Sequence, residues 1–190
     1  MTFPGSPHPR GAAFPPLLDV GCGDGKTTEL LARKCEVLAC DFSREALLSL
    51  RSQRDPDGIV NLVECNIGSL PFEQEKFDVV ACVHALSHLA ADDRARASAE
   101  MSRVLRREGI LLVEAFGRAD FRFGSGREVE DSSFLRGNGI MTHYFREGEI
   151  PVLFPGLETV AEVGSIKRVS FGATAGKRDL IRVLMRKSPG

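Results

Sequence analysis

The 190-residue chain has almost no net charge, because 25 basic residues are balanced by 26 acidic ones to give −1 at neutral pH. A large positive surplus is typical of proteins that bind nucleic acid or anionic membranes over a broad surface. The absence of that surplus gives no support to either class. A local basic patch remains compatible with the composition.

Long apolar runs are also missing. No segment approaches the ~20 consecutive apolar residues that a bilayer-spanning helix needs. The N-terminus lacks the charged and then apolar order of a secretion signal. With 43% hydrophobic and 27% charged residues, the chain can bury one substantial core. We therefore expect a single domain that is soluble and cytoplasmic, with no membrane partner and with an oligomeric state that the sequence leaves open.

Closely paired cysteines are the third absence, since the five cysteines are odd in number and form no C-x-x-C pair. This argues against both a disulfide framework and a zinc ribbon. Four of them follow the carboxyl ends of predicted strands and are expected to lie near one another: Cys22, Cys40, Cys65 and Cys82. A metal cluster is one interpretation, but structural sites usually pair their ligands locally. We favour small apolar residues packing beside a bound ligand, and no metal.

Glycines, by contrast, are concentrated near the start of the chain. Residues 17–25 read LLDVGCGDG, an apolar run followed by Gly21, Gly23 and Gly25. Glycine can adopt positive φ and lets the backbone approach a ligand closely. The next residues carry helix formers with helical spacing of apolar positions. This pattern predicts a strand, a ligand-binding turn and a helix.

The spacing of the glycines separates three ligand classes. A dinucleotide fingerprint would need glycine at position 26, which is Lys26, and a phosphate-binding loop would need it at Val20. What remains is Asp19-x-Gly21-x-Gly23-x-Gly25, which resembles the first motif of the Rossmann-like S-adenosylmethionine-dependent methyltransferases.

Asp41 follows a second predicted strand, 20 residues after Gly21. A carboxylate at this spacing can accept hydrogen bonds from both hydroxyls of a ribose. The alternative is that Asp41 caps the next helix, but Ser43 is the better cap. We favour the ribose interpretation.

Two later segments extend the resemblance to residues 17–116. Residues 60–64 predict a third strand, and the turn after them is similar to the family's adenine-binding loop, with Asn66 where the family usually has Asp. Residues 77–82, FDVVAC, predict a fourth strand with a family signature. The amide oxygen of Asn66 can still accept a hydrogen bond from an adenine amino group.

The resemblance implies S-adenosyl-L-methionine as cofactor and an α/β fold, a Rossmann-like doubly wound sheet of seven strands that is mostly parallel with an antiparallel C-terminal pair. The cofactor-binding residues that it implies are Asp19, Gly21, Cys22, Gly23, Gly25, Asp41, Phe42, Asn66, Ile67 and Cys82. By this resemblance the glycines approach the methionine portion, with Asp19 near its amino group. Phe42 packs on the adenine, and Asn66 with Ile67 reads its edge.

The alternation of strands and helices independently predicts a doubly wound sheet. A helix is expected from Asp92 or Asp93 to Leu105, a fifth strand at 110–115, and a final strand pair at 158–169 and 180–185. Two parts depart from this regularity. Residues 1–16, with five prolines, predict an irregular lead before a single domain at 17–190, and residues 117–143 form a long insert. We expect the insert to shape much of the acceptor pocket.

Candidate catalytic residues are His84, His143 and Tyr144. His84 follows the fourth strand, where the family places residues that face the substrate, and an imidazole can accept a proton from a hydroxyl or amine. A hydrogen-bonded structural histidine is an equal alternative. His143 and Tyr144 precede 145–149, which are similar to the short helix before the family's final strand pair. His88 is expected to support the loop beside the cofactor, and Glu114 is a further candidate base.

We therefore predict an S-adenosylmethionine-dependent methyltransferase. Transfer needs mainly the alignment of acceptor, methyl and sulfur, so no catalytic triad is required. A small-molecule acceptor is favoured because the charge is near neutral. One alternative is a tRNA base, since residues 144–149 are similar to a stretch of wobble-uridine tRNA methyltransferases; it predicts a basic stripe at the pocket mouth. Another is a non-catalytic cofactor-binding subunit of a partner, and a nucleotide hydrolase is a remote third.

Overall fold

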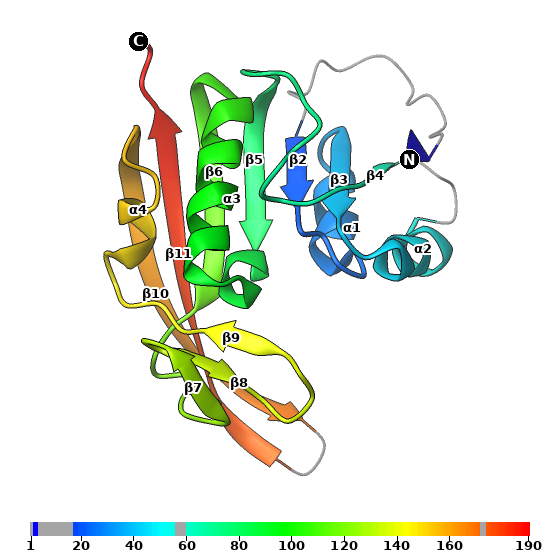
Figure 1. Cartoon of the computed structure of the whole chain (residues 1–190). Coiled ribbons are helices and arrows are strands. Elements are labelled where there is room, and N and C mark those ends of the chain that lie inside the picture. Colours follow the sequence, from blue (N-terminus) through cyan, green and yellow to red (C-terminus); the bar gives the residue numbers. More distant parts are fainter. Residues whose placement is uncertain (1, 4–16, 56–59, 172–173) are drawn as a thin grey trace.

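A computed structural model describes residues 2–3, 17–55, 60–171 and 174–190 of the chain (Figure 1). The helices and strands are, in chain order, β1 Thr2–Phe3, β2 Leu17–Val20, α1 Lys26–Ala32, β3 Val37–Asp41, α2 Arg44–Gln53, β4 Asn61–Glu64, β5 Phe77–Val83, the short 3-10 helix η1 Ala85–His88, α3 Ala91–Val104, β6 Leu105–Phe116, β7 Arg127–Glu130, β8 Ser133–Leu135, β9 Met141–His143, α4 Glu149–Val152, β10 Leu157–Phe171 and β11 Thr174–Lys187.

The central sheet has the strand order β1-β4-β3-β2-β5-β6-β11-β10. Neighbours from β4 to β6 pair in parallel, whereas β11 pairs antiparallel with both β6 and β10. Seven of these strands are the predicted Rossmann-like doubly wound sheet, mostly parallel with an antiparallel C-terminal pair, and this prediction is confirmed.

The eighth strand lies in the segment that was expected to be irregular. Thr2 and Phe3 pair antiparallel with Val63 and Leu62 at the edge of the sheet. They were missed because two residues are too few to show an alternating pattern, and their pairing depends on β4, which is far away in the sequence. The other residues of the predicted lead, residue 1 and residues 4–16, lie outside the described residues.

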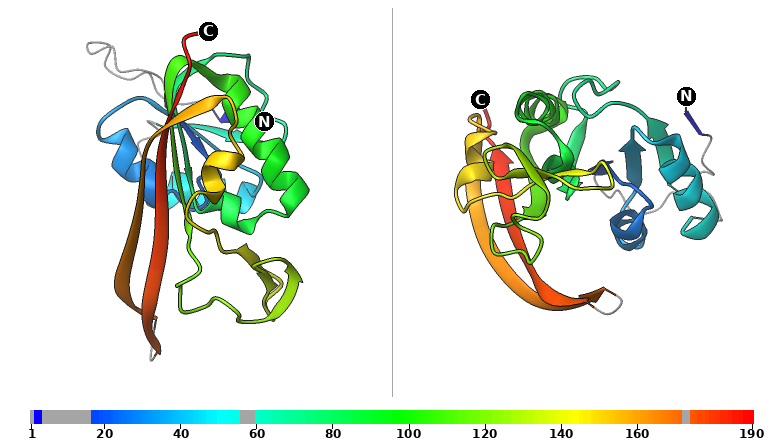
Figure 2. Two further views of the ribbon diagram at one scale, coloured as in Figure 1. Left: turned by 90° about the vertical axis from the view of Figure 1, so that its left-hand side faces the viewer. Right: turned by 60° about the horizontal axis from the view of Figure 1, so that its bottom comes forward.

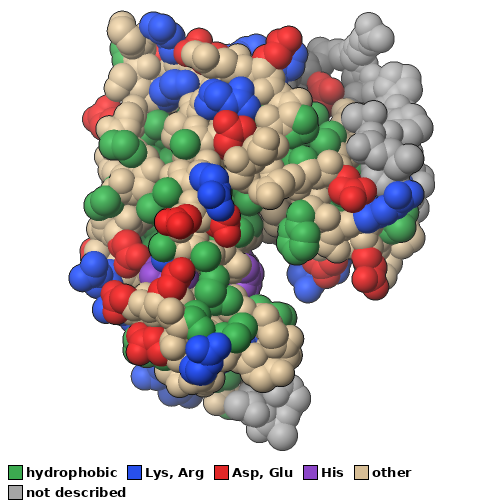
Figure 3. All heavy atoms as spheres, viewed as in Figure 1, with side chains coloured by type: hydrophobic (Ala, Val, Ile, Leu, Met, Phe, Trp, Pro, Cys, Tyr) green, Lys and Arg blue, Asp and Glu red, His purple; other side chains and the backbone are tan. Residues whose placement is uncertain are grey.

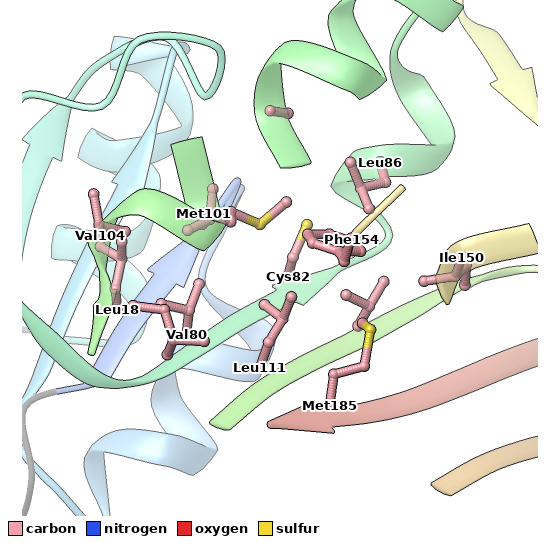
Figure 4. Packing of buried hydrophobic residues seen from close by; sticks show 14 of the residues in the cluster. Leu18, Val80, Cys82, Leu86, Met101, Val104, Leu111, Ile150, Phe154 and Met185 are labelled. Atoms are coloured by element: carbon pink, nitrogen blue, oxygen red, sulfur yellow. The ribbon is translucent and has the colours of Figure 1, made fainter. Parts of the chain in front are cut away.

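Helices cover both faces of the sheet (Figure 2). On one face, Leu47 and Leu50 of α2 pack with Val37 and Ala39 of β3. On the other face, a larger cluster joins the sheet to α3 and α4, and Figure 4 shows part of it, including Leu18, Val80, Met101 and Phe154. Each fully buried side chain of this size contributes about 1.5–3 kcal/mol by leaving water. The two clusters fix the central strands, and therefore the loops that follow them.

The insert 117–143 is more regular than expected. It contains the three-stranded antiparallel sheet β7-β8-β9. The bridge between Gly117 and Phe145 and a bond from the Phe121 N–H to the Lys177 carbonyl at 2.9 Å are among the contacts that join the insert to the rest of the chain. The predicted short helix at 145–149 is wrong in position, because α4 begins only at Glu149. Gly148 precedes it with φ of 77°, a left-handed conformation through which a right-handed helix does not continue.

The strands β10 and β11 form a long ribbon. β11 pairs with β6 only from Leu180 to Arg186, so that residues 166–171 and 174–179 extend past β6. In Figures 1 and 2 this end of the ribbon and the insert both project beyond the carboxyl ends of the central strands.

Among the described residues, no helix is long and apolar enough to cross a membrane.

Candidate active site

A cavity of about 610 Å³ lies at the carboxyl ends of the central parallel strands. Its wall is formed by segments that follow four strands and by Asp93 of α3: residues 21–24 and 26–27 after β2, 40–42 at β3, 65–68 after β4, and 83–85 with 88–89 after β5. Figure 3 shows the surface hollowed in this region, with histidine side chains on the wall. The volume lies within the ~300–1,000 Å³ typical of small-molecule sites, and the position is where doubly wound sheets bind ligands.

The three glycines of the first turn all have positive φ, 70° at Gly21, 54° at Gly23 and 83° at Gly25. A Cβ on Gly21 would lie 2.4 Å from the Cβ of Ala85, and one on Gly25 would lie 2.3 Å from Cγ of Leu50. Only Gly23 has open space where a side chain would be. Gly21 and Gly23 line the cavity, whereas Gly25 allows α1 to pack against α2.

Asp41 connects the two predicted halves of the site. Its Oδ2 accepts a hydrogen bond from the backbone N–H of Gly23 at 2.8 Å, and its Oδ1 accepts one from Ser43 at 2.9 Å. Each carboxylate oxygen has a second lone pair that remains available to a ribose hydroxyl. The glycine turn and Asp41 therefore share one cavity. Ser43 caps α2 as predicted, since its Oγ accepts from the Ala46 N–H at 3.2 Å.

The side of the cavity that is predicted to hold the adenine has an exposed aromatic ring and a polar turn. The side chain of Phe42 lines the cavity and is 81% exposed, which leaves its ring free to cover a planar ligand. Asn66 and Ile67 also line it. The Asn66 Oδ1 accepts a hydrogen bond from the Gly68 N–H at 2.8 Å, so the amide holds its own turn and keeps one lone pair for a ligand.

Two other predicted cofactor-binding residues lie beneath the cavity and do not line it. Asp19 is 1% exposed, and its Oδ2 accepts a 2.6 Å hydrogen bond from Thr28 Oγ1. Burial raises the pKa of Asp19 to about 6, and the bond from Thr28 opposes this shift. Cys82 is fully buried in the core cluster, where burial raises its pKa. For both residues, as for Gly25, a cofactor contact stays a prediction.

The predicted grouping of cysteines is found in part. Cys22, Cys40 and Cys65 line the cavity, and all five cysteines are free thiols. The described part of the chain contains no group of three metal-ligating side chains suitably placed for an ion.

His84 is the predicted catalytic residue that lines the cavity. Its ring stacks on Phe116 with 4.5 Å between centroids, and its Nε2 lies 3.3 Å from Oε1 of Glu114. Burial lowers the pKa of His84, although the negative charge of Glu114 acts in the opposite direction. Since its ordinary pKa of 6.5 is already below 7, the imidazole is neutral at pH 7. The Nδ1 atom is buried and has no hydrogen-bond partner among the described residues.

His143 and Tyr144 are brought together with other residues, away from the cavity wall. Both ring nitrogens of His143 have a hydrogen-bond partner. Nδ1 lies 2.8 Å from Ser133 Oγ, and Nε2 lies 2.7 Å from Glu149 Oε1. Tyr144 is 1% exposed and packs with Phe116 and Phe134. A serine, histidine and carboxylate in a row are typical of hydrolases, but Ser133 is fully buried and out of a substrate's reach. Catalytic roles for His143 and Tyr144 stay predictions without a contact to the cavity.

The cavity wall includes residues that the motifs did not identify as binding residues, notably Thr27, Leu89 and Asp93. Asp93 is in the first turn of α3, and its approach depends on how α3 packs rather than on any local signal. His88, expected to support this loop, lines the cavity and bonds through Nδ1 to the Met141 carbonyl at 2.9 Å. None of the described insert residues is in the cavity wall, so the prediction that the insert shapes the acceptor pocket stays untested.

Two arginines lie on the other side of the cavity wall. The guanidinium groups of Arg122 and Arg178 are each 4.9 Å from the centroid of Phe116, the ring on which His84 stacks. Both pair with Asp120, Arg122 at 3.2 Å and Arg178 at 2.9 Å. This cationic layer is a local excess of positive charge that the near-neutral total conceals.

The site can now be compared with known proteins. A family model described as a methyltransferase domain matches residues 18–113, which include the glycine turn, Asp41, Asn66 and His84. A solved S-adenosylmethionine-dependent methyltransferase from Methanosarcina mazei superimposes with a TM-score of 0.75 at 22% identity, covering 93% of each chain. The chain belongs to the methyltransferase domain family, as an enzyme that uses S-adenosyl-L-methionine.

Curated relatives give finer detail. The chain is 32% identical over 175 residues to the tRNA N(3)-cytidine methyltransferase METTL2 of Mus musculus, covering 84% of this chain and 45% of that protein. The Drosophila melanogaster tRNA N(3)-methylcytidine methyltransferase Mettl2 is 33% identical over 147 residues, 70% of this chain and 45% of that protein. The chain thus spans less than half the length of these relatives.

Proposed function

We propose that this chain transfers a methyl group from S-adenosyl-L-methionine to N3 of a cytidine in tRNA. The observation that carries the proposal is the 32% identity to a tRNA N(3)-cytidine methyltransferase over 84% of the chain. The small-molecule acceptor favoured from sequence has no comparable support, and neither has a wobble uridine as the base in the tRNA alternative. Cytoplasmic action, which the composition predicts, belongs to the same proposal.

The residues of the cavity fit the cofactor. Asp41 would hold the ribose hydroxyls, and Phe42 with Asn66 would take the adenine. Gly23, whose backbone has open space beside it, would leave room for the methionine portion. When bound, the cofactor supplies an electrophilic methyl group on a sulfonium.

The acceptor chemistry needs little from the protein beyond alignment. N3 of neutral cytosine has a free lone pair, so no residue would have to remove a proton from it before it could take the methyl group that the bound cofactor would supply. The methylated base becomes cationic and can then lose a proton from its exocyclic amino group. The neutral His84 imidazole on the cavity wall would accept that proton, with Glu114 beside it to balance the charge.

A cytidine that is stacked within a base-paired segment of RNA cannot reach this cavity, so the base must leave its stack. The cationic layer of Arg122 and Arg178 behind Phe116 favours an anionic substrate near the wall.

The proposal is tested by incubating the full chain with methyl-labelled S-adenosyl-L-methionine and unmodified tRNA transcripts, followed by nucleoside mass spectrometry. We expect labelled 3-methylcytidine. Transcripts in which the cytidine that accepts the label is replaced by uridine should give no labelled product. Label in a uridine would make the cytidine assignment wrong. Cofactor binding without label in any RNA would instead favour the non-catalytic subunit.

A further inference from the structure

The projecting end of the β10–β11 ribbon carries an unusual arrangement of charge. Residues 163–178 contain four cations and no acid, although the whole chain has a net charge of −1. Lys167 lies directly opposite Arg178, and Arg168 lies directly opposite Lys177. Like charges in directly opposed positions of an antiparallel pair are destabilising. Two consecutive pairs of this kind therefore act against the stability of the ribbon itself.

Carboxylates of the described residues pair with only one of these four cations. Lys167, Arg168 and Lys177 are exposed, and none of them forms an ion pair with another described residue. Elsewhere many arginines have a carboxylate close by, as Arg106 has Asp78 at 2.8 Å. Of the four ribbon cations, only Arg178 has such a partner, Asp120, which it shares with Arg122.

The position of these residues relates them to the cavity. The ribbon end projects beyond the carboxyl ends of the central strands, at the edge of the sheet where the cavity lies (Figures 1 and 2). Lys167 and Arg178 point to the same face of the ribbon because directly opposed residues share a face. On that face Arg178 contacts the ring of Phe116, and His84 stacks on the same ring. Positive charge on this face thus continues from Lys167 to the wall of the active site, whereas Arg168 and Lys177 point to the opposite face of the ribbon.

We propose that Lys167, Arg168, Lys177 and Arg178, the basic ribbon, bind the phosphate backbone of the RNA whose base enters the cavity, through the three exposed cations Lys167, Arg168 and Lys177 on the two faces of the ribbon and with Arg178, which is paired with Asp120, adding its charge beside Phe116. This inference rests on the proposed function for the identity of the RNA. Phosphates between the opposed cations remove their mutual repulsion and release condensed counterions, which favours binding without sequence preference. The basic ribbon positions the RNA, and base selection is left to the cavity.

The test uses the full chain with Lys167, Arg168 and Lys177 all changed to Ala, because these three side chains are exposed and lack ion pairs. Binding of an unmodified tRNA transcript is measured by fluorescence anisotropy between about 50 and 200 mM salt, because affinity for nucleic acid depends strongly on salt in this range. We expect the affinity to fall about tenfold or more, and the slope of log K against log salt to decrease by about two.

A matched variant changes Lys34, Lys76 and Arg186 to Ala. These residues are also exposed cations without a described ion pair, and they lie near the ends of the sheet's strands remote from the cavity. The same loss of three charges there should leave the tRNA affinity and its salt slope close to those of the parent. S-adenosylhomocysteine affinity and thermal midpoint, measured for both variants, establish that each is folded with an intact cofactor site. If the ribbon variant fails this control, Lys167→Gln with Lys177→Gln replaces it.

Parental affinity and slope in the ribbon variant would overturn the proposal, as would an equal loss in the matched variant. The result is independent of the reaction. If the parent forms 3-methylcytidine while the ribbon variant binds tRNA normally, the proposed role of the basic ribbon is wrong and the proposed function stands. If no cytidine is methylated but the ribbon variant alone loses RNA binding, the basic ribbon is upheld as an RNA-binding surface and the proposed function fails.

Discussion

Asp41 organises the wall of the cavity before any ligand binds. Its two oxygens accept the N–H groups of Gly23 and Ser43, so a single carboxylate fixes the glycine turn relative to the start of α2. Removing the whole side chain would leave both N–H groups without this acceptor in a largely buried place, at about 1–3 kcal/mol for each group. A test of ribose binding therefore needs a substitution that retains an acceptor.

Asp41→Asn removes the charge and one of the two acceptor oxygens but preserves the shape of the side chain. We expect S-adenosylhomocysteine affinity to fall about 10- to 100-fold, because hydrogen bonds to a charged group contribute about 1.5–3 kcal/mol. Isothermal titration calorimetry measures this change. Asp92→Asn, at an exposed position of α3, should bind like the parent. Equal affinities of Asp41→Asn and the parent would show that Asp41 does not hold the ribose.

At the scale of elements, the insert is joined to α4 by a buried hydrogen-bonded chain. Ser133 of β8 bonds His143 of β9, and His143 bonds Glu149 at the start of α4. Burial would raise the pKa of Glu149, but the bonds from the His143 ring and the Arg146 N–H outweigh it and hold the pKa at about 2. The ionised carboxylate is therefore the form that stabilises the fold.

This arrangement predicts a dependence of stability on pH. Because the pKa of Glu149 is lower in the folded chain than its ordinary 4.5, its stabilising effect is complete above about pH 4.5 and is lost as the pH falls toward 2. Urea unfolding should show Glu149→Gln to be less stable than the parent by about 2 kcal/mol at pH 6. The difference should shrink between pH 4.5 and 3. The exposed Glu147→Gln should match the parent throughout, and a pH-independent difference for Glu149→Gln would contradict the role of its charge.

At the scale of the whole molecule, cofactor binding and stability are coupled. The cavity wall comes from segments after four different strands, so a ligand that contacts all of them binds only the folded chain. S-adenosylhomocysteine at 100 times its dissociation constant should add about 2.7 kcal/mol to the free energy of unfolding. For a chain of this size, that raises the midpoint of thermal unfolding by about 5–10 °C.

Differential scanning fluorimetry measures this shift, with a nucleoside triphosphate as the comparison ligand. The triphosphate should leave the midpoint unchanged, since the glycine spacing does not match a phosphate-binding loop. A shift with the triphosphate and none with S-adenosylhomocysteine would contradict the assignment of the cofactor.

Local signals were enough to predict the fold and to bring the glycine turn and Asp41 to one cavity. The apolar strands, the glycine turn and the acid 20 residues after Gly21 are all sequence patterns, and the carboxyl ends of parallel strands necessarily lie at one edge. The prediction therefore placed Gly21, Gly23, Asp41 and Asn66 in one cavity correctly. Residues 117–143 were harder, because three very short strands pair only with one another and show little alternation.

The sequence by itself determined the order of strands and helices, the glycine turn and the choice of ligand class, because these depend on backbone conformation and spacing along the chain. Only the tertiary structure decided which side chains reach the cavity. It buried Asp19 and Cys82 beneath the cavity and turned Gly25 toward Leu50. It also placed His143 beside Ser133 and Tyr144 beside Phe134, away from the cavity wall. It also opposed Lys167 with Arg178 and Arg168 with Lys177. These contacts join residues far apart in the chain, and the packing and register that create them have no local signal.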